Sequence, residues 1–218
     1  MKNLHRQILV TGLFLFLFAA IGTGMVAYTY DATRERIHEN ERLALLRHIH
    51  QIINPERHDN DLFHDTIQVV DPNLLGTDEP VTVYRARMGG HPVAVVMTPV
   101  APDGYNGSIR LLVGIDVNGR ITGVRVLSHR ETPGLGDAIE ADRSDWILGF
   151  EGRSLNDPPE SQWAVKRDGG VFDQFTGATI TPRAVVKAVK RALIYFEQHR
   201  EALFAAPASA NTETIPDE

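Results

Sequence analysis

Residues 109–127 read IRLLVGIDVNGRITGVRVL, and this stretch decides the fold class. Two runs rich in β-branched residues, 109–117 and 120–127, flank the pair Asn118-Gly119. Such a pair between apolar runs suits the positive backbone angles of a type I′ turn and is a strong hairpin signal. Side chains alternate in character along the second run, as expected where one face of a sheet is buried. The stretch therefore predicts an antiparallel hairpin.

The segments on either side extend this hairpin into a larger sheet with helices. Residues 81–87 and 92–97 flank Gly89-Gly90 and predict a second hairpin, and residues 67–70 predict a short strand. After a loop-rich stretch, apolar residues recur at helical spacing from residue 181 to about residue 204 and predict a helix with one buried face. We therefore expect an α+β domain whose mostly antiparallel sheet is flanked by helices.

The N-terminal region contains an uncharged apolar run, residues 7–30. About 20 apolar residues in a helix span the hydrocarbon core of a bilayer, so the run predicts a single transmembrane helix. A cleaved signal peptide is the alternative, with Lys2 and Arg6 as its positive region. The run exceeds a usual signal core and no convincing cleavage site follows it, which favours an uncleaved anchor. Flanking charges do not settle the topology, but the short tail before the run favours a domain outside the cytoplasm.

These features predict four parts of the chain. Residues 1–30 form the N-terminal tail and transmembrane anchor, and residues 31–54 form a stalk or packing helix that ends before Pro55. Residues 55–206 form the folded domain. Residues 207–218 are small, polar and acidic, and are expected to be a disordered tail.

Composition excludes several classes of function. The 218-residue chain has no cysteine, so it contains no Fe–S ligand, no disulfide and no thiol nucleophile. Its net charge is −6 without a basic patch, which argues against nucleic acid as a partner. The nine histidines lack metal-ligand spacing, so no metal site is expected. No acid–base constellation stands out, and no catalytic residue is predicted.

The stretch that carries chemistry is residues 173–182, DQFTGATITP. Pro182 suits the first position of a helix, and Thr181 is a natural N-cap before it. Thr179 would then lie just ahead of a helix N-terminus, where backbone N–H groups and the helix dipole stabilise an anion. Gly177 and Ala178 leave room for a bulky group to approach the backbone. The pattern is compatible with a phosphate beside a threonine hydroxyl, but taken alone it favours a capped helix after a tight turn.

The segment Asp173-x-x-Thr176-Gly177-Ala178-Thr179 resembles the flavinylation motif of proteins that receive FMN from FAD through a flavin transferase. In that family the last threonine of the motif is esterified by the FMN phosphate. The resemblance therefore implies that Thr179 is the acceptor.

A second stretch makes the resemblance more specific. Residues 128–137, SHRETPGLGD, resemble the glutamate-threonine-proline-glycine loop of the same family. With residues 144–146 and 165–170, they resemble the G subunit of the Rnf/Rsx electron transport complex, a family related to the C subunit of the sodium-pumping quinone reductase. The resemblance runs from the N-terminal anchor to about Phe196.

The resemblance implies a membrane-anchored electron carrier with covalent FMN, working as a non-autonomous redox subunit of a complex that couples electron transfer to ion translocation. Its partners would be the other Rnf/Rsx subunits and, during maturation, a flavin transferase that uses FAD. The chain would lie in the bacterial inner membrane with its domain in the periplasm. Two alternatives are a flavin-free membrane-tethered sensor or assembly module, and a self-standing flavoprotein reductase.

The resemblance also implies which residues lie at the cofactor. Lys166 could stabilise a reduced anionic flavin, and Asp173 is expected to help the transferase recognise the motif. The 131–136 loop could instead be turn punctuation with surface side chains. Trp146 and Trp163 are expected to pack in the core rather than on the ring. The residues expected at the cofactor are Thr179, Asp173, Thr176, Gly177, Ala178, Glu131, Thr132, Pro133, Gly134, Leu135, Gly136 and Lys166.

Overall fold

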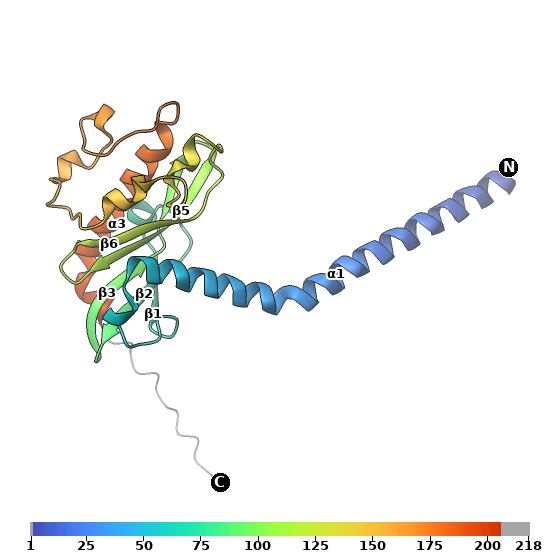
Figure 1. Cartoon of the computed structure of the whole chain (residues 1–218). Coiled ribbons are helices and arrows are strands. Elements are labelled where there is room, and N and C mark those ends of the chain that lie inside the picture. The colour runs from blue at the N-terminus through green and yellow to red at the C-terminus, as the bar shows by residue number, and fades with distance from the viewer. Residues whose placement is uncertain (1, 206–218) are drawn as a thin grey trace, which may run out of the picture. The chain divides into compact units, whose positions relative to one another are not determined.

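The computed structural model describes residues 2–205, and the predicted tail at 207–218 lies outside them. The chain divides into two compact units, Met1–Leu46 and Arg47–Glu218. The helices are α1 Lys2–Ile52, α2 Pro72–Leu75 and α3 Ile180–Phe204; the strands are β1 Thr66–Val69, β2 Val81–Met88, β3 His91–Met97, β4 Val100–Gly104, β5 Gly107–Asp116 and β6 Ile121–Ser128 (Figure 1). Short 3-10 helices occupy Pro55–Arg57, Gly136–Ile139, Asp145–Phe150, Glu160–Gln162 and Lys166–Asp168.

The strands form one antiparallel sheet of six strands, which confirms the α+β fold. β1, β2 and β3 follow one another, and β3 then pairs with residues 113–116 of β5. β4 pairs with the first part of β5, and β6 pairs with residues 110–115. β4 was not predicted, and the tight turn that joins it to β5 contributes to the site described below.

The predicted type I′ turn at Asn118-Gly119 is wrong in type. Gly119 has φ +79°, but no non-glycine residue among those described has a positive φ, so Asn118 does not adopt the required angle. The Asp116 carboxylate accepts hydrogen bonds from the N–H groups of Asn118 (2.8 Å) and Arg120 (3.0 Å). This local bonding favours a type I turn followed by a left-handed glycine. Gly89 and Gly90, both with positive φ, supply the two-residue hairpin turn instead.

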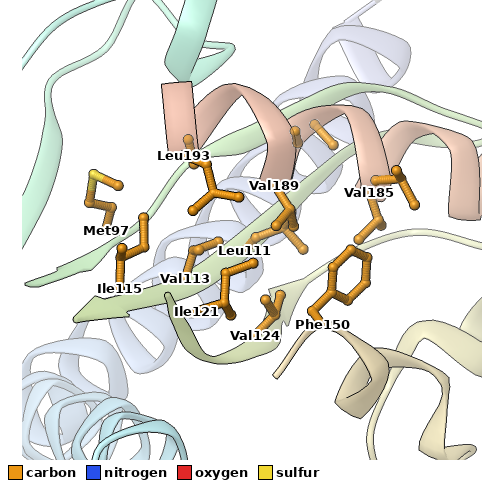
Figure 2. Packing of buried hydrophobic residues seen from close by; sticks show 14 of the residues in the cluster. Met97, Leu111, Val113, Ile115, Ile121, Val124, Phe150, Val185, Val189 and Leu193 are labelled. Atoms are coloured by element: carbon orange, nitrogen blue, oxygen red, sulfur yellow. The ribbon is translucent and has the colours of Figure 1, made fainter. Parts of the chain in front are cut away.

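α3 packs on one face of the sheet and forms the main core with it. Val189 and Leu193 of α3 point toward Leu111, Val113 and Ile115 of β5 (Figure 2). All five side chains are fully buried. Each contributes about 1.5–3 kcal/mol by leaving water. Side chains repeat every 3.6 residues along a helix and every two residues along a strand, so Val189 and Leu193 share one face of α3, and Leu111, Val113 and Ile115 share the face of β5 opposite it.

The end of α1 covers the opposite face of the sheet. Ile49 and Ile52 are buried, and Ile52 lies directly over Gly114 and Gly123. A Cβ atom on Gly123 would lie 2.7 Å from Ile52 Cγ2, so the two strands must carry glycine for the helix to approach this closely. Residues 47–52 of α1 therefore belong to the same compact unit as the sheet.

An aromatic cluster holds the long segment between β6 and α3 against the domain. Phe150 stacks on Phe172 at 4.6 Å between ring centroids, and Trp163 lies 5.1 Å from Phe172. Trp146 meets Phe150 edge-on at 5.3 Å. This segment was expected to be loop-rich, and its short 3-10 turns acquire their order from these rings.

The first unit is helical throughout its described residues. Its apolar side chains from Ile8 to Tyr30 are exposed within the chain, Phe14 by 68%. Such a continuous apolar surface is stable in lipid rather than water. α1 is long and apolar enough to cross a membrane, which agrees with the predicted anchor.

Candidate functional site

A cavity of about 630 Å³ opens where three segments meet, within the size range of small-molecule sites. The turn between β4 and β5 supplies one wall, the loop after β6 a second, and the turn into α3 the third; Arg167, from the 3-10 helix Lys166–Asp168, also lines the cavity. The lining residues are Tyr105, Glu131, Thr132, Leu135, Gly136, Arg167, Gly177, Ala178, Thr179, Ile180 and Thr181.

Thr179 lies at this cavity, half-buried, as the N-cap residue of α3. Its side chain makes no capping hydrogen bond to the helix. The turn before it is closed by the Ala178 N–H, which donates to the Phe175 carbonyl at 3.1 Å. Gly177 has φ +82° in that turn, a conformation that favours glycine. The hydroxyl therefore stands at the beginning of a 25-residue helix, beside N–H groups that have no partner within the helix.

The prediction that Thr181 is the N-cap and Pro182 the first helical residue is wrong. α3 begins at Ile180, and Thr181 lies in its first turn, fully buried. Its hydroxyl donates to the Glu131 carboxylate instead of capping the helix backbone. A long-range partner thus displaces the local capping bond, and the N-cap position passes to Thr179.

Glu131 joins all three walls of the cavity. It is only 4% exposed, and its Oε2 accepts the Thr181 hydroxyl while its Oε1 accepts the Asn106 N–H at 3.0 Å. Its own N–H donates to His129 Nδ1 at 3.0 Å, so the His129 Nε2–H is left to donate to Glu140 at 2.8 Å. A buried carboxylate needs such partners. Glu131 is therefore a brace within the site, rather than the surface residue that was the alternative.

The loop around Gly136 fits this brace closely. A Cβ atom on Gly136 would lie 2.9 Å from both Glu131 Cβ and Thr181 Oγ1. Gly134, two residues earlier, has φ +77° and lies on the surface. The close approach at Gly136 brings the loop against the first turn of α3.

The structure brings most of the predicted cofactor residues together. Thr179, Gly177, Ala178, Glu131, Thr132, Leu135 and Gly136 all line the cavity. Thr176, Pro133 and Gly134 are exposed neighbours that do not line it. Lys166 and Asp173 also lie outside the lining; the Lys166 ammonium pairs with the Asp173 carboxylate at 2.6 Å.

Four lining residues were not among those predicted at the cofactor: Tyr105, Arg167, Ile180 and Thr181. Tyr105 was not predicted because β4 carries no clear strand pattern, so the turn from β4 to β5 was not recognised in the sequence. Arg167 is adjacent in sequence to Lys166, the cation that was predicted at the cofactor. The backbone N–H of Arg167 donates to Gln174 Oε1 at 3.3 Å. That bond places the exposed Arg167 beside the turn into α3.

The two tryptophans pack as expected. Trp163 is buried, and its indole N–H donates to the carbonyls of Ser154 and Pro158, both at 3.1 Å. Trp146 donates to the Asp173 carbonyl at 2.8 Å. Neither lines the cavity. Trp146 instead steadies the backbone of the motif that precedes Thr179.

An ion pair also holds the start of α3. Arg183 donates to Asp168 through Nε at 2.6 Å and Nη2 at 2.9 Å, a two-point contact. The hydrogen bond from Arg183 lowers the pKa of Asp168 below its usual value, and it raises the pKa of Arg183. The pair links the 3-10 turn that carries Arg167 to the first turns of α3.

Residues 104–194 match the model of the FMN-binding domain, and residues 1–52 match that of the RnfG N-terminal region. A Shewanella loihica protein, named as the G subunit of an ion-translocating oxidoreductase complex, is 50% identical over 96% of this chain and 99% of its own length. The chain belongs to this G-subunit family of ion-translocating oxidoreductase complexes. Proteins of the same name from Pseudomonas aeruginosa (49% identity; 96% of this chain, 98% of theirs) and Vibrio atlanticus (48%; 93% and 96%) agree.

The family's FMN-binding domain and the cavity coincide, and the residues present fit FMN. Every lining residue, from Tyr105 to Thr181, falls inside the matched domain. The helix N-terminus at Thr179 suits a phosphate, and Gly177 leaves space beside it. Leu135 and Ile180 supply apolar surface for a flat ring.

Proposed function

We propose that this protein carries FMN as a phosphoester on Thr179 and serves as an electron carrier within an ion-translocating membrane complex. The observation that carries the proposal is the position of Thr179 at the N-terminus of α3 and on the wall of the cavity. The family's FMN-binding domain and the names of its relatives support the same cofactor and complex.

The attachment follows from the chemistry of that position. The Thr179 oxygen would bond to the FMN phosphorus of FAD, the pyrophosphate bond would break, and AMP would leave as the hydroxyl proton is lost. A flavin transferase would be the partner for this step, recognising the exposed Asp173 and Thr176 beside the acceptor. The resulting phosphodiester keeps one negative charge, which the first N–H groups of α3 and the Arg167 guanidinium would stabilise.

The attached isoalloxazine would supply the redox chemistry, and the chain supplies its position. Glu131 holds the loop carrying Leu135 and Gly136 against α3, so the ring site keeps its shape. Lys166 pairs with Asp173 outside the cavity, so it would help to position the motif that carries Thr179 rather than touch the ring. Exposed Pro133 and Gly134 would shape the loop.

The membrane arrangement is part of the proposal. Residues 1–30 would anchor the chain in the bacterial inner membrane, residues 31–54 would lead to the domain, and residues 55–206 would bind FMN in the periplasm. The apolar surface of α1 supports the anchor. The protein would work with the other members of its complex rather than alone, which predicts no turnover with a soluble donor in their absence.

The attachment is tested with the full chain co-expressed with a flavin transferase. Thr179→Ala should abolish flavin fluorescence on a denaturing gel and the mass increase of one FMN minus one water. Thr179→Ser keeps a hydroxyl and should retain some loading, and Thr176→Ala should weaken loading without abolishing it. Full loading of the Thr179→Ala chain would refute the assignment, and an unmodified natural chain would support the flavin-free alternative.

A further inference from the structure

Tyr105 is an exposed aromatic residue at the cavity. It follows β4 in the turn to β5, its side chain is 64% exposed, and it lines the same cavity as Thr179. It is the only aromatic residue on that wall among residues 2–205. Within the described part of the chain it takes part in no ring–ring contact, whereas both tryptophans are engaged by neighbouring rings. Packing in the hydrophobic core therefore does not account for an aromatic residue at this position.

Two further exposed apolar side chains line the same cavity as Tyr105. Leu135 and Ile180 are each 44% exposed, and they come from the other two walls. Outside α1, the only other large apolar residues exposed in the described chain are Val70 and Met88. Three of the five thus gather at one cavity. Such clustering marks a surface that a ligand covers.

The turn that carries Tyr105 is held in place. The Asn106 side chain donates from Nδ2 to Thr132 Oγ1 at 3.1 Å, in addition to the backbone bond to Glu131. Gly104 has no Cβ, and one built there would lie 3.0 Å from Glu131 Oε1. The β4–β5 turn is therefore tied to the loop beside it, and Tyr105 is presented at a defined place on the cavity wall.

We infer that Tyr105 contacts the flavin ring of the attached cofactor and determines how far that ring is covered. The inference rests on the proposed attachment at Thr179. An isoalloxazine has a flat π face and an apolar benzenoid edge. The aromatic ring of Tyr105 can pack against the flat face of the isoalloxazine, and the apolar side chains of Leu135 and Ile180 can pack against its benzenoid edge. Tyr105 would be a positioning contact that limits the access of water and of redox partners.

The test uses the full chain loaded with FMN in detergent. Fluorescence on a denaturing gel counts the attached flavin, and native fluorescence per attached flavin reports the contact. A tyrosine beside an excited flavin quenches it by giving an electron that then returns, whereas a phenyl ring does not. Tyr105→Phe should therefore raise native fluorescence while preserving the visible circular dichroism of the bound ring.

Tyr105→Ala should raise fluorescence, change the circular dichroism, and increase the iodide quenching constant by about two- to tenfold, the range expected from loss of one aromatic contact. Asn106→Ala keeps the tyrosine but removes its side-chain tether, so it should have the same effects to a smaller extent. Met88→Ala is the matched control, because Met88 is an exposed apolar residue of the β2–β3 hairpin and does not line the cavity. Its fluorescence, circular dichroism and iodide quenching should equal those of the natural chain.

Fully loaded Tyr105 variants with natural fluorescence and iodide quenching would overturn the inference. They would leave the attachment at Thr179 intact, because loading is counted separately on the denaturing gel. Absence of flavin from the natural chain would instead refute the attachment, and the contact with it.

Discussion

The buried hydroxyl of Thr181 donates a hydrogen bond to the buried carboxylate of Glu131, 50 residues away in sequence. This contact fastens the first turn of α3 to the loop that follows β6. The same carboxylate accepts the Asn106 N–H from the β4–β5 turn. The cavity is therefore assembled around one acidic side chain that joins three separate segments, and Thr179, two residues before Thr181, lines the cavity.

Replacing Thr181 with valine should destabilise the domain. The change conserves shape but removes the donor, and leaving a buried acceptor without its partner costs about 1–3 kcal/mol. Urea unfolding, followed by circular dichroism, should show this loss, and flavin loading at Thr179 should fall. Thr176→Val, at an exposed site, is the control for stability alone. Equal stability of the two variants would show that the Glu131 contact contributes little.

Gly136→Ala should disturb the site by overpacking. The new methyl group would lie 2.9 Å from atoms of both Glu131 and Thr181, which must move apart. Overpacking of this kind costs about 1–3 kcal/mol. Gly149→Ala is the matched control, because a Cβ there meets nothing within 4 Å and needs no positive φ. A thermal unfolding midpoint no lower in Gly136→Ala than in Gly149→Ala would contradict the close approach.

Ile52→Ala should destabilise the sheet domain even though Ile52 lies at the end of the membrane-proximal helix. Its side chain is 4% exposed and packs over Gly114 and Gly123. Deleting a buried isoleucine side chain costs about 2–5 kcal/mol. Ile37→Ala is the control on the same helix, since that residue is exposed. Unfolding of the full chain in detergent, monitored by tryptophan fluorescence, distinguishes the two.

The Asp168–Arg183 pair should make part of the stability sensitive to acid. Arg183 lowers the pKa of Asp168 in the folded chain, so the pair stabilises the fold above the unfolded pKa of the carboxyl. That contribution is lost as pH falls through the lowered pKa. The stability difference between the natural chain and Asp168→Asn should therefore shrink on acidification from neutral pH, and also in high salt. A difference that stays constant down to about pH 2 would exclude the pair as its source.

Local pattern alone predicted the elements whose signals lie within a few residues. The alternation in β5 and β6, the apolar stripe of α3 and the uncharged run of α1 each identify an element, because side-chain period follows directly from backbone geometry. The placement of Thr179 just ahead of a helix could be predicted in the same way.

Only tertiary contacts decided the rest. β4, Val100–Gly104, contains Pro102 and Asp103 and lacks a strand pattern; it is extended because it pairs with β5. Thr181 looks like an N-cap, yet its hydroxyl goes to Glu131. Both outcomes depend on groups far apart in sequence whose hydrogen bonds must be satisfied once burial removes water. The sequence by itself determined the motif that contains the proposed acceptor Thr179, and the folded chain determined which side chains surround it.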